Sequence, residues 1–483
     1  MLNKDIDNSI HVSSEVGKLK RLLVHSPDSG LGKVVPSKAQ DWLFEDIVHL
    51  GNMRKQEYDF YTKLLLYFLD PEKVRGKLKQ IDSAESNRKF YKPDNSEFHN
   101  SDKVVELQLL LSQILEDKLI KTKLVVSICA VEGCTIDTEE ELMNISEGNL
   151  AKTLISGTLP SGRMIFAPLP NLIFTRDIGI VINDHILLNK PAKVARTREA
   201  LLTKYIFFNH PFFKHLRKNI IEIPNNQNHF LLPNGEKDYK SITLEGGDVM
   251  MVASNHILIG ISERTSPYAV NQVVKILFEK NVLTKITAIK IPKKRDYMHI
   301  DTIFTQVKRN VWVLLGSLSR EGEELERQDF MESLIDEKVT EKLKILQFIK
   351  GENTPKTFEY LEDLLTDISI NDLKSKEEVK FVYSGNNVFP YGAREQWTDS
   401  CNLLALREGV VIGYDRNDKT ADAFKNIGFT TIKAEDLLEK FENNELVPEE
   451  MKNTLILLPS AELSRARGGS HCMSMPLWRE NIN

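Results

Sequence analysis

The chain of 483 residues contains only four cysteines, Cys129, Cys134, Cys401 and Cys472. Four cysteines in a chain of this length are too few for a disulfide framework, and Cys129 and Cys134 lack the second pair that a zinc site needs. The sequence also has no His-Glu-x-x-His motif and no glycine-rich phosphate loop. These absences argue against disulfide-stabilised, zinc-dependent and P-loop proteins, and they favour a reducing, cytoplasmic setting.

An excess of one charge and long apolar runs are also lacking. The chain carries 64 basic and 69 acidic residues, a net charge of −5, so nothing in its charge balance indicates binding to nucleic acid or to an anionic membrane. No run approaches the roughly 18 apolar residues of a membrane span, and Met1–Asp7 has no apolar core of a signal peptide. We therefore expect a globular protein of two or three domains, or one large one, with neither nucleic acid nor membrane as a partner.

What the sequence does contain is a recurring short apolar strand that ends in a small or turn-forming residue. Two stretches look like copies of one unit, Ile257–Arg264 and Val410–Arg416. Each continues into a helical pattern, Ala269–Phe278 in the first case and Thr420–Ile427 in the second. A strand–turn–helix–strand unit that is used several times predicts a repeated α/β architecture rather than one doubly wound sheet.

Two segments interrupt this pattern. In residues 53–153, apolar side chains recur at three- and four-residue steps, as in Glu57–Phe68 and Val104–Leu115, which predicts helices. Residues 320–380 are rich in charge and also helical in pattern, as in Phe330–Val339, which indicates a solvated helix face. The expected organisation is a first module at 1–52, an inserted helical domain at 53–153, and the remaining modules at 154–483, with a charged helical insertion at about 320–380.

Cys472 is distinguished by its surroundings. It lies in the run Arg467–Pro476, which includes two glycines, two serines and His471. Glycines let the backbone approach a ligand closely, and a nearby positive charge favours thiolate over thiol. A buried cysteine without a chemical role is the commoner case for a lone thiol. Three motifs elsewhere in the chain favour a nucleophile instead.

These three motifs supply a base and several acids. His299 and Asp301 are two residues apart, so on a strand they point to one face, where they suit acid–base chemistry. The alternative is a structural histidine bonded to a neighbouring carboxylate. Glu245–Asp248 places two acids around two glycines and, taken alone, is a turn. Phe174–Asp177 mixes polar and apolar residues, which is also ordinary for a surface loop.

Together, the acids and the thiol indicate one type of substrate. Several carboxylates near a thiolate would repel it unless a cation neutralised them. A guanidinium group is planar, permanently charged and rich in donors that match carboxylates, and its central carbon is a target for a thiolate. Arg196 and Arg264 would then hold a carboxylate at the other end of the molecule.

Six motifs resemble the arginine deiminase family in order and spacing. They are Pro170–Asp177, Leu244–Val249, Ser262–Thr265, Met298–Thr302, Arg394–Trp397 and Gly468–Pro476. The likeness begins at Leu19–Asp46 and runs to the last residues. It implies the α/β fold of the guanidino-group-modifying (pentein) superfamily, a five-bladed α/β propeller of ββαβ-type modules with a helical domain inserted after the first module.

The resemblance also implies a reaction, the hydrolysis of L-arginine to L-citrulline and ammonia without metal or organic cofactor. In this family pattern Cys472 is the nucleophile, and His299 protonates the departing ammonia and then activates water. Asp177 and Asp301 hold the guanidinium nitrogens. Glu245 pairs with His299 and with the charged end of the substrate.

The remaining residues carried over from the family are expected to bind substrate. Arg196 and Arg264 grip its carboxylate with help from Asn171, Phe174 packs on its aliphatic stem, and Arg467 acts as a gate at the entrance. L-arginine is therefore the expected small-molecule partner, and we expect a homo-oligomer, a dimer or tetramer, in the cytoplasm.

Other readings stay open at the level of sequence. An amidinotransferase would pass the amidino group to an amine instead of water, a methylated arginine or agmatine would be another substrate, and a scaffold would have lost activity. The chain also departs from the family pattern at His25–Asp28, where His-Arg-Pro-Gly is usual, and at Glu57–Asp59, where tyrosine replaces a common histidine. Neither position carries chemistry in this interpretation.

Overall fold

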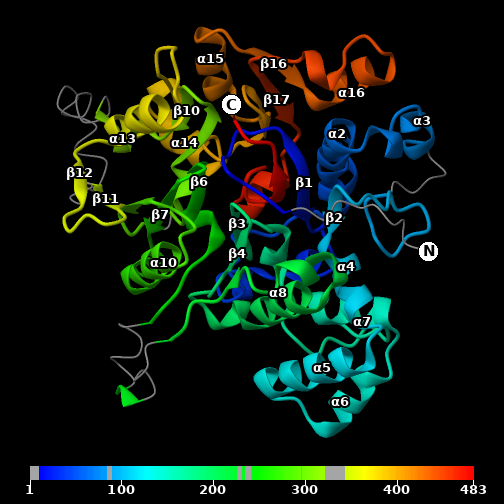
Figure 1. Cartoon of the computed structure of the whole chain (residues 1–483). Helices are drawn as coiled ribbons and strands as arrows, with labels where there is room; N and C mark the ends of the chain where they lie inside the picture. The colour runs from blue at the N-terminus through cyan, green and yellow to red at the C-terminus, as the bar shows by residue number, and fades with distance from the viewer. Residues whose placement is uncertain are drawn as a thin grey trace.

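The structure is a computed structural model that describes residues 10–83, 90–225, 231–233, 241–294, 296–320 and 343–482. Its described residues form a mixed α/β protein with five separate sheets. In Figure 1 the strands lie around the middle of the molecule and most helices lie at its periphery.

Each of the five sheets contains the same three-strand unit, in which two strands pair antiparallel and a third lies parallel to the second. The units are β18 (Met475–Arg479), β1 (Leu19–Val24) and β2 (Val104–Glu106); β3 (Gly179–Ile182), β4 (His185–Leu188) and β5 (Ile220–Ile221); β6 (Val249–Ala253), β7 (His256–Ile261) and β8 (Lys285–Lys290); β9 (Phe304–Lys308), β10 (Val311–Leu314) and β13 (Lys380–Tyr383); and β14 (Leu404–Arg407), β15 (Val410–Tyr414) and β17 (Thr454–Leu458). In the last sheet β16 (Thr430–Lys433) is added beside β17.

A helix follows the second strand of each unit. These helices are α2 (Asp59–Leu69), α8 (Thr197–Asn209), α10 (Pro267–Glu279), α13 (Leu361–Asp367) and α15 (Asp418–Asn426), and α16 (Ala434–Glu442) follows in the last unit. The two stretches that look alike in the sequence are β7 with α10 and β15 with α15, so the predicted strand–turn–helix–strand repeat is confirmed in these sheets. β15 is buried at every position, which is why such strands appear as apolar runs without alternation.

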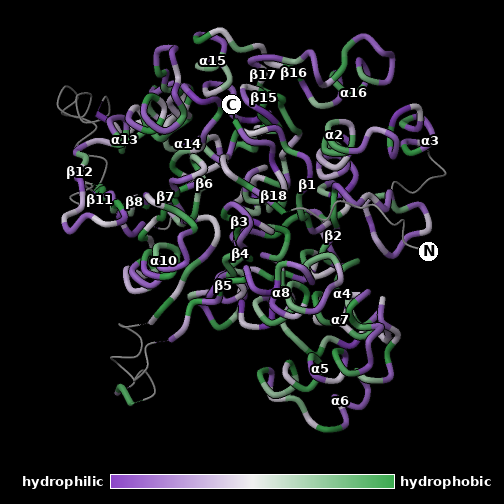
Figure 2. The backbone as a smooth tube through the Cα atoms, in the orientation of Figure 1, coloured by the Kyte–Doolittle hydropathy of each residue, from purple (hydrophilic) through white to green (hydrophobic). Residues whose placement is uncertain are grey.

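The segment predicted as a helical insertion is mostly helical, but it also contains one strand. Its further helices are α3 (Leu78–Ile81), α4 (Leu107–Ile114), α5 (Lys118–Glu132), α6 (Ile136–Met143) and α7 (Glu147–Ser156). Between α3 and α4 the chain returns to the first sheet as β2, beside β1. In Figure 2 the outer helices α5 and α16 alternate between hydrophobic and hydrophilic residues, as expected for helices with one buried face.

The prediction of a charged helical segment over residues 320–380 is wrong for residues 344–358. These form β11 (Lys344–Ile349) and β12 (Lys356–Phe358), and β11 pairs antiparallel with β8. Exposed and buried side chains alternate at the start of β11, the pattern of a strand with one face on the core. Phe330–Val339, which carried the helical pattern, lies outside the described residues.

The two ends of the described chain meet in one sheet. β1 pairs antiparallel with β18, so Leu23 lies opposite Met475, and the backbone N–H of His11 donates to the carbonyl of Leu477 at 2.9 Å. This pairing fixes the segment that follows Cys472. None of the helices described here has both the length and the apolarity needed to cross a membrane.

Candidate active site

Cys472 lies on a turn between a short 3-10 helix, Leu463–Ala466, and β18. Its backbone N–H donates to Oδ1 of Asn402 at 3.0 Å. A Cβ at Gly469 would lie 2.5 Å from the carbonyl oxygen of Asn402, and one at Gly468 would lie 2.2 Å from the ring of Phe174. The two glycines are therefore required by close approach, not by flexibility.

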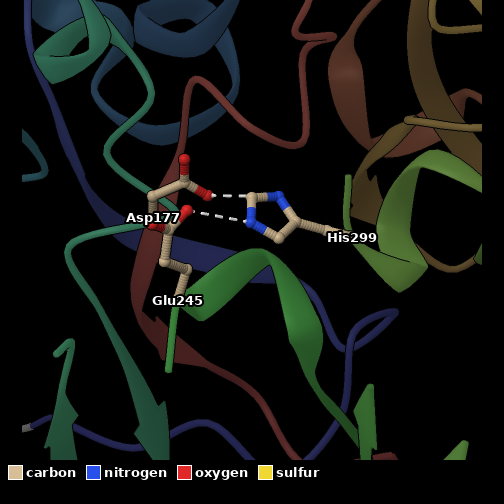
Figure 3. A group of neighbouring side chains, drawn as sticks. All are labelled: Asp177, Glu245 and His299. Atoms are coloured by element: carbon tan, nitrogen blue, oxygen red, sulfur yellow. Dashed lines mark hydrogen bonds and ion pairs between the residues drawn. The ribbon is translucent and has the colours of Figure 1, made fainter. Parts of the chain in front are cut away.

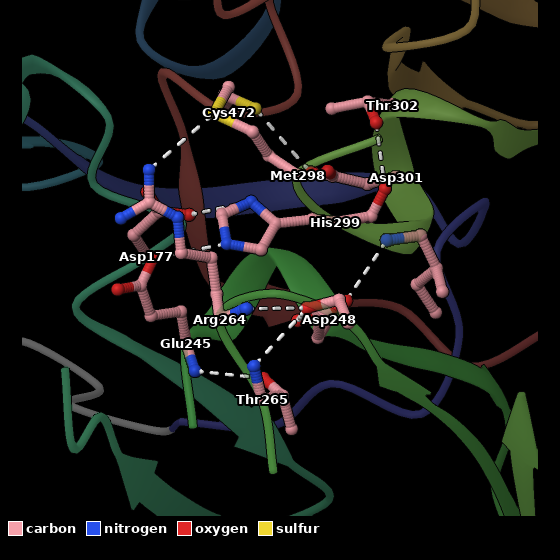
Figure 4. A network of polar contacts seen from close by, with 12 residues as sticks. Asp177, Glu245, Asp248, Arg264, Thr265, Met298, His299, Asp301, Thr302 and Cys472 are labelled. Carbon is pink, nitrogen blue, oxygen red and sulfur yellow. Dashed lines mark hydrogen bonds and ion pairs between the residues drawn. The ribbon is translucent and has the colours of Figure 1, made fainter. Parts of the chain in front are cut away.

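The predicted site residues are drawn together from distant parts of the chain. Cys472 lines a pocket of about 470 Å³, counted with its open mouth. The other predicted residues on its wall are Asn171, Phe174, Asp177, Arg196, Glu245, Arg264, His299 and Arg467. The remaining one, Asp301, lies beside the nucleophile, with Oδ2 3.5 Å from the sulfur (Figure 4).

His299 is held between two acids (Figure 3). Its Nε2 lies 3.0 Å from Oε2 of Glu245, and its Nδ1 lies 3.8 Å from Oδ1 of Asp177. Burial lowers the pKa of His299, but the charge of Asp177 and the hydrogen bond to Glu245 outweigh burial and raise that pKa to about 10. The imidazole is therefore a cation at neutral pH and can give up a proton.

Turns, not strands, position this histidine and its acids. His299 and Asp301 were expected on one strand, but His299 is an extended residue before the 3-10 turn Ile300–Thr302. Glu245 similarly precedes the turn Gly246–Asp248, in agreement with its sequence. The two turns are tied together because the backbone N–H of Ile300 donates to Oδ1 of Asp248 at 3.1 Å. Burial raises the pKa of Asp248 to about 6.

Glycine is required in the second of these turns. A Cβ on Gly247 would lie 2.6 Å from Nδ1 of His299 and 3.0 Å from Oδ1 of Asp177. Such distances are too short for any side chain, so Gly247 is what lets the histidine and the aspartate lie side by side.

Three acids in the site each have one buried oxygen without a hydrogen-bond partner among the described residues. These atoms are Oδ1 of Asp177, Oε1 of Glu245 and Oδ1 of Asp301. A buried carboxylate oxygen is stable only with a donor or a cation nearby. The part of the site formed by these three acids, which we call its cation-binding end, therefore suits a cation that presents several N–H groups.

A metal ion is a poorer match for the same acids. One ligand atom each from Asp177, Glu245 and His299 lies within 4.8 Å of the others, which is close enough for a metal centre. A metal ligand must be deprotonated, however, and His299 has a pKa raised to about 10.

Arg196 does not lie where a carboxylate clamp was predicted. Its Nη1 contacts Oδ2 of Asp177 at 3.1 Å and Oε2 of Glu245 at 2.8 Å, and its Nε contacts Glu199 at 3.0 Å. The guanidinium is thus bound to acids at the cation-binding end of the pocket, because three buried carboxylates attract it there. It leaves Oδ1 of Asp177 and Oε1 of Glu245 without a hydrogen-bond partner among the described residues.

Two other arginines present N–H groups to the pocket. Arg264 has Nη2 3.9 Å from the sulfur of Met298, and Arg467 lies with Cζ 3.6 Å from the centre of the Trp397 ring. Within the described part of the chain, Nε and Nη1 of both arginines have no hydrogen-bond partner although they are buried. The pocket therefore has an anion-binding side as well as a cation-binding one.

The thiol itself is not activated by its protein neighbours. Burial raises the pKa of Cys472, and the charges of Asp301, Asp177 and Asp399 raise it further, well above the usual value for a thiol. The surrounding acids therefore keep the sulfur protonated until a cation offsets their charge.

Sequence reasoning missed three residues of the site. Asn402 binds the backbone of both Cys472 and Asp301, His471 contacts the carboxylate of Asp301, and Glu15 contacts His471. His471 was considered only as a nearby charge. Glu15 has no local signal, because its contact is made with a residue 456 positions away.

The mouth of the pocket carries the early motif Leu19–Asp46 as well. Leu43 and Glu45 line the pocket, and the amide of Asn171 donates to the carbonyl of Trp42 at 3.0 Å. Asp46 pairs with Arg465 at 3.0 Å. This loop is thereby fixed to the segment that precedes Cys472.

A sequence model of arginine deiminase matches residues 80–479. The chain belongs to the arginine deiminase family. Among its relatives, the arginine deiminase of Borrelia garinii subsp. bavariensis is 28% identical over 492 residues, which cover 98% of this chain and 99% of the relative. The arginine deiminase of Listeria welshimeri is 29% identical over 487 residues, with 99% and 100% covered.

Solved structures resemble this arginine deiminase family member only distantly. The amidinotransferase SxtG from Microseira wollei is 13% identical, with a TM-score of 0.43 and 98% of each chain covered. DDAH from Pseudomonas aeruginosa is also 13% identical, with a TM-score of 0.35, and 64% of this chain and 78% of that protein are covered. Likenesses of this size bear on neither fold nor function.

Proposed function

We propose that the protein hydrolyses L-arginine to L-citrulline and ammonia through a covalent intermediate on Cys472. One observation carries this proposal: among the residues described, a single pocket holds buried carboxylate oxygens and buried arginine N–H groups that lack hydrogen-bond partners. L-arginine has the complementary charges, a guanidinium at one end and a carboxylate at the other. Family membership points to the same substrate.

Binding uses both sides of the pocket. The substrate guanidinium donates to Oδ1 of Asp177, Oε1 of Glu245 and Oδ1 of Asp301, which matches planar N–H groups to three acceptors. The aliphatic stem packs along Phe174. Arg264 receives the substrate carboxylate.

Arg467 and Asn171 complete the carboxylate side. Arg467 also stacks on Trp397, which is 40% exposed, and this contact with an exposed ring supports the predicted gate. Arg196 stays on the other oxygens of Asp177 and Glu245 and keeps both acids in place, so we assign it a positioning role instead of the predicted clamp.

The chemistry follows from charge and proximity. The bound cation offsets the acids around Cys472, so the pKa of the thiol falls and the sulfur releases its proton to solvent. The thiolate attacks the guanidinium carbon, and a carbon–sulfur bond forms. His299 gives its proton to one nitrogen, the carbon–nitrogen bond breaks, and ammonia leaves.

Water completes the reaction. His299, now neutral, takes a proton from a water molecule, which attacks the amidino carbon. The carbon–sulfur bond breaks, the new hydroxyl group gives its proton to the departing thiolate, and the carbon with its oxygen becomes the ureido group of citrulline. His299 is protonated again, and the enzyme returns to its starting state.

The architecture is part of the proposal. We infer that the five sheets close into a five-bladed α/β propeller, because each repeats one three-strand unit and the last strand, β18, completes the unit begun by β1. The segment boundaries at 1–52, 53–153 and 154–483 are proposed with it. The cytoplasmic location and the dimer or tetramer stay predictions.

The deciding experiment measures citrulline and ammonia from purified protein and L-arginine. Cys472→Ala should abolish both products, whereas Cys134→Ala, a half-buried thiol outside the pocket, should retain activity. Robust citrulline production by Cys472→Ala would refute the proposal. Adding glycine to the reaction tests the amidinotransferase alternative, because ornithine and a new guanidino product would then replace citrulline.

A further inference from the structure

We propose that His471 and Glu15 are positioning residues that keep Asp301 ionised and turned toward the substrate. The proposal rests on the proposed function, since Asp301 is assigned there to the guanidinium. His471 contacts Asp301 and Glu15 contacts His471, and neither of the two residues is among those that line the pocket.

The histidine lies between two carboxylates. Nδ1 of His471 is 2.9 Å from Oδ2 of Asp301, and Nε2 is 3.3 Å from Oε2 of Glu15. All three side chains are buried. A neutral imidazole would turn a lone pair toward one of the carboxylates, so both ring nitrogens must carry a hydrogen. His471 is therefore an imidazolium in this arrangement.

Glu15 is in turn held as a carboxylate. Its two oxygens lie 3.3 and 3.4 Å from Nη1 and Nη2 of Arg176, and the charge of Arg479 is nearby. Burial raises the pKa of Glu15, but Arg176 and His471 outweigh burial and lower it. The charges then alternate from Arg176 through Glu15 and His471 to Asp301, and the substrate guanidinium is the next charge in the series.

This arrangement decides which oxygen of Asp301 faces the substrate. Oδ2 accepts from His471 and from the thiol of Cys472, while Oδ1 has no hydrogen-bond partner among the described residues. Burial raises the pKa of Asp301, but the hydrogen bond and charge of His471 outweigh burial and lower it. Without the imidazolium, a buried carboxylate 3.5 Å from the sulfur of Cys472 would take up a proton more readily.

The chain contains a matched control for this geometry. His25 is also buried between two carboxylates, with Nδ1 2.9 Å from Glu106 and Nε2 3.1 Å from Asp28. Burial lowers the pKa of His25, but hydrogen bonds to Asp28 and Glu106 outweigh burial and raise it to about 9. His25 does not line the catalytic pocket, so the same substitution there tests the fold without touching Asp301.

The experiment measures L-arginine binding by calorimetry between pH 5.5 and 8.5, in full-length Cys472→Ala protein that cannot turn substrate over. Adding His471→Asn or Glu15→Gln should weaken binding increasingly as the pH falls, by about tenfold for each pH unit below the raised pKa of Asp301. Adding His25→Asn should leave the binding curve unchanged, although it lowers the melting temperature.

The outcomes are separate from those of the catalytic proposal. If His471→Asn and Glu15→Gln bind L-arginine with the pH dependence of the Cys472→Ala background, the positioning role is refuted. An equal shift in His25→Asn would also refute it, because the effect would then come from the fold. Failure of the otherwise unmodified enzyme to produce citrulline would overturn the proposed reaction and leave this binding result standing.

Discussion

At the scale of single residues, the site works by balancing charge in a buried space. Asp177, Glu245 and Asp301 are held close together by the cations of Arg196, His299 and His471. Each acid nevertheless has one oxygen without a hydrogen-bond partner among the described residues. An unpaired buried charge is unstable. A ligand with a positive charge and several hydrogen-bond donors therefore stabilises these three acids most.

The two pocket arginines should differ in which substrates they affect. Arg264→Ala should raise KM for L-arginine at least about tenfold and leave KM for agmatine nearly unchanged, because agmatine lacks the carboxylate. Arg196→Ala should raise KM for both, since Arg196 contacts the acids that bind the guanidinium. Steady-state kinetics with the two substrates measures this. If Arg196→Ala raised KM for L-arginine but not for agmatine, the result would support the carboxylate clamp predicted from the sequence.

Asp399 provides a test of pH dependence near the nucleophile. Burial raises the pKa of Asp399 from 3.8 to about 7, against the lowering effect of Arg467. The folded protein holds this proton more tightly than the unfolded chain does. Ionisation of Asp399 therefore lowers the free energy of unfolding, and this loss of stability begins near pH 3.8 and is complete above about pH 7. Asp399→Asn should therefore be more stable than the unmodified protein at pH 8, on the order of 1–3 kcal/mol, and the difference should narrow toward pH 4.

Urea unfolding at pH 4.5, 6.5 and 8 checks this expectation, and Asp41→Asn, an exposed position, is the control that should show no such trend. The charge of Asp399 also raises the pKa of Cys472. Iodoacetamide should therefore inactivate Asp399→Asn at lower pH than the unmodified protein. A stability difference that grows as the pH falls would contradict the assignment.

The identities of the site residues could be predicted from the sequence, but the directions in which their side chains point could not. Cys472 and His299 stand in distinctive local motifs, and both were found in the pocket. The side chain of Arg196 has several rotatable bonds, and three carboxylates from different segments decide where it points. Glu15 was missed because its importance depends on a contact across nearly the whole chain.

At the scale of elements, short turns position the chemistry and the strands hold the turns. Glu245 and His299 each stand just before a 3-10 turn, and Cys472 lies on the turn before β18. Alternation on one strand face therefore gave the wrong local structure for His299 and Asp301, although both reach the same site. Strands and helices with strong apolar periodicity were predictable, whereas β11 was hidden in a segment rich in charge.

The turn Gly246–Asp248 should tolerate no added methyl group. In Gly247→Ala, the new Cβ would lie 2.6 Å from Nδ1 of His299, so the imidazole has to move away from Asp177. Displacement of a catalytic group by about 1 Å lowers activity roughly a hundredfold, and we expect that loss in kcat/KM. Gly148→Ala is the matched control, because a Cβ there contacts nothing within 4 Å and the residue lies in α7.

Gly148→Ala should be fully active. Its free energy of unfolding should be higher than that of the unmodified protein by about 0.5–1 kcal/mol, because alanine favours the helix. Citrulline assays and urea unfolding on both variants make the comparison. Full activity in Gly247→Ala would show that the close approach of this turn to His299 is not needed for catalysis.

At the scale of the whole molecule, the two ends of the chain depend on each other. The repeat of strands and helices was visible in the sequence as similar stretches, but the partner of β1 was not, because β18 lies more than 450 residues away in sequence. This pairing brings Glu15, near the start, to His471, near the end. The first sheet is therefore a structural unit and also the support of the nucleophile.

Leu477 tests how strongly the fold depends on this closure. It is fully buried in β18, and its carbonyl accepts from His11. Leu477→Ala should destabilise the protein by about 2–5 kcal/mol, the range for a large apolar side chain removed from a packed core. Leu346 lies in β11 and is 37% exposed, so Leu346→Ala should lower the free energy of unfolding by much less.

Urea unfolding measures the stability of both variants, and the reactivity of the Cys472 thiol is a second probe. Because β18 begins only three residues after Cys472, loosening β18 should also loosen the turn that holds the sulfur. Iodoacetamide should therefore label Cys472 faster in Leu477→Ala than in Leu346→Ala at urea concentrations below the unfolding midpoint. Equal labelling rates, with Leu477→Ala clearly less stable, would mean that the nucleophile is held by Asn402 and its own glycines without help from the closing strand.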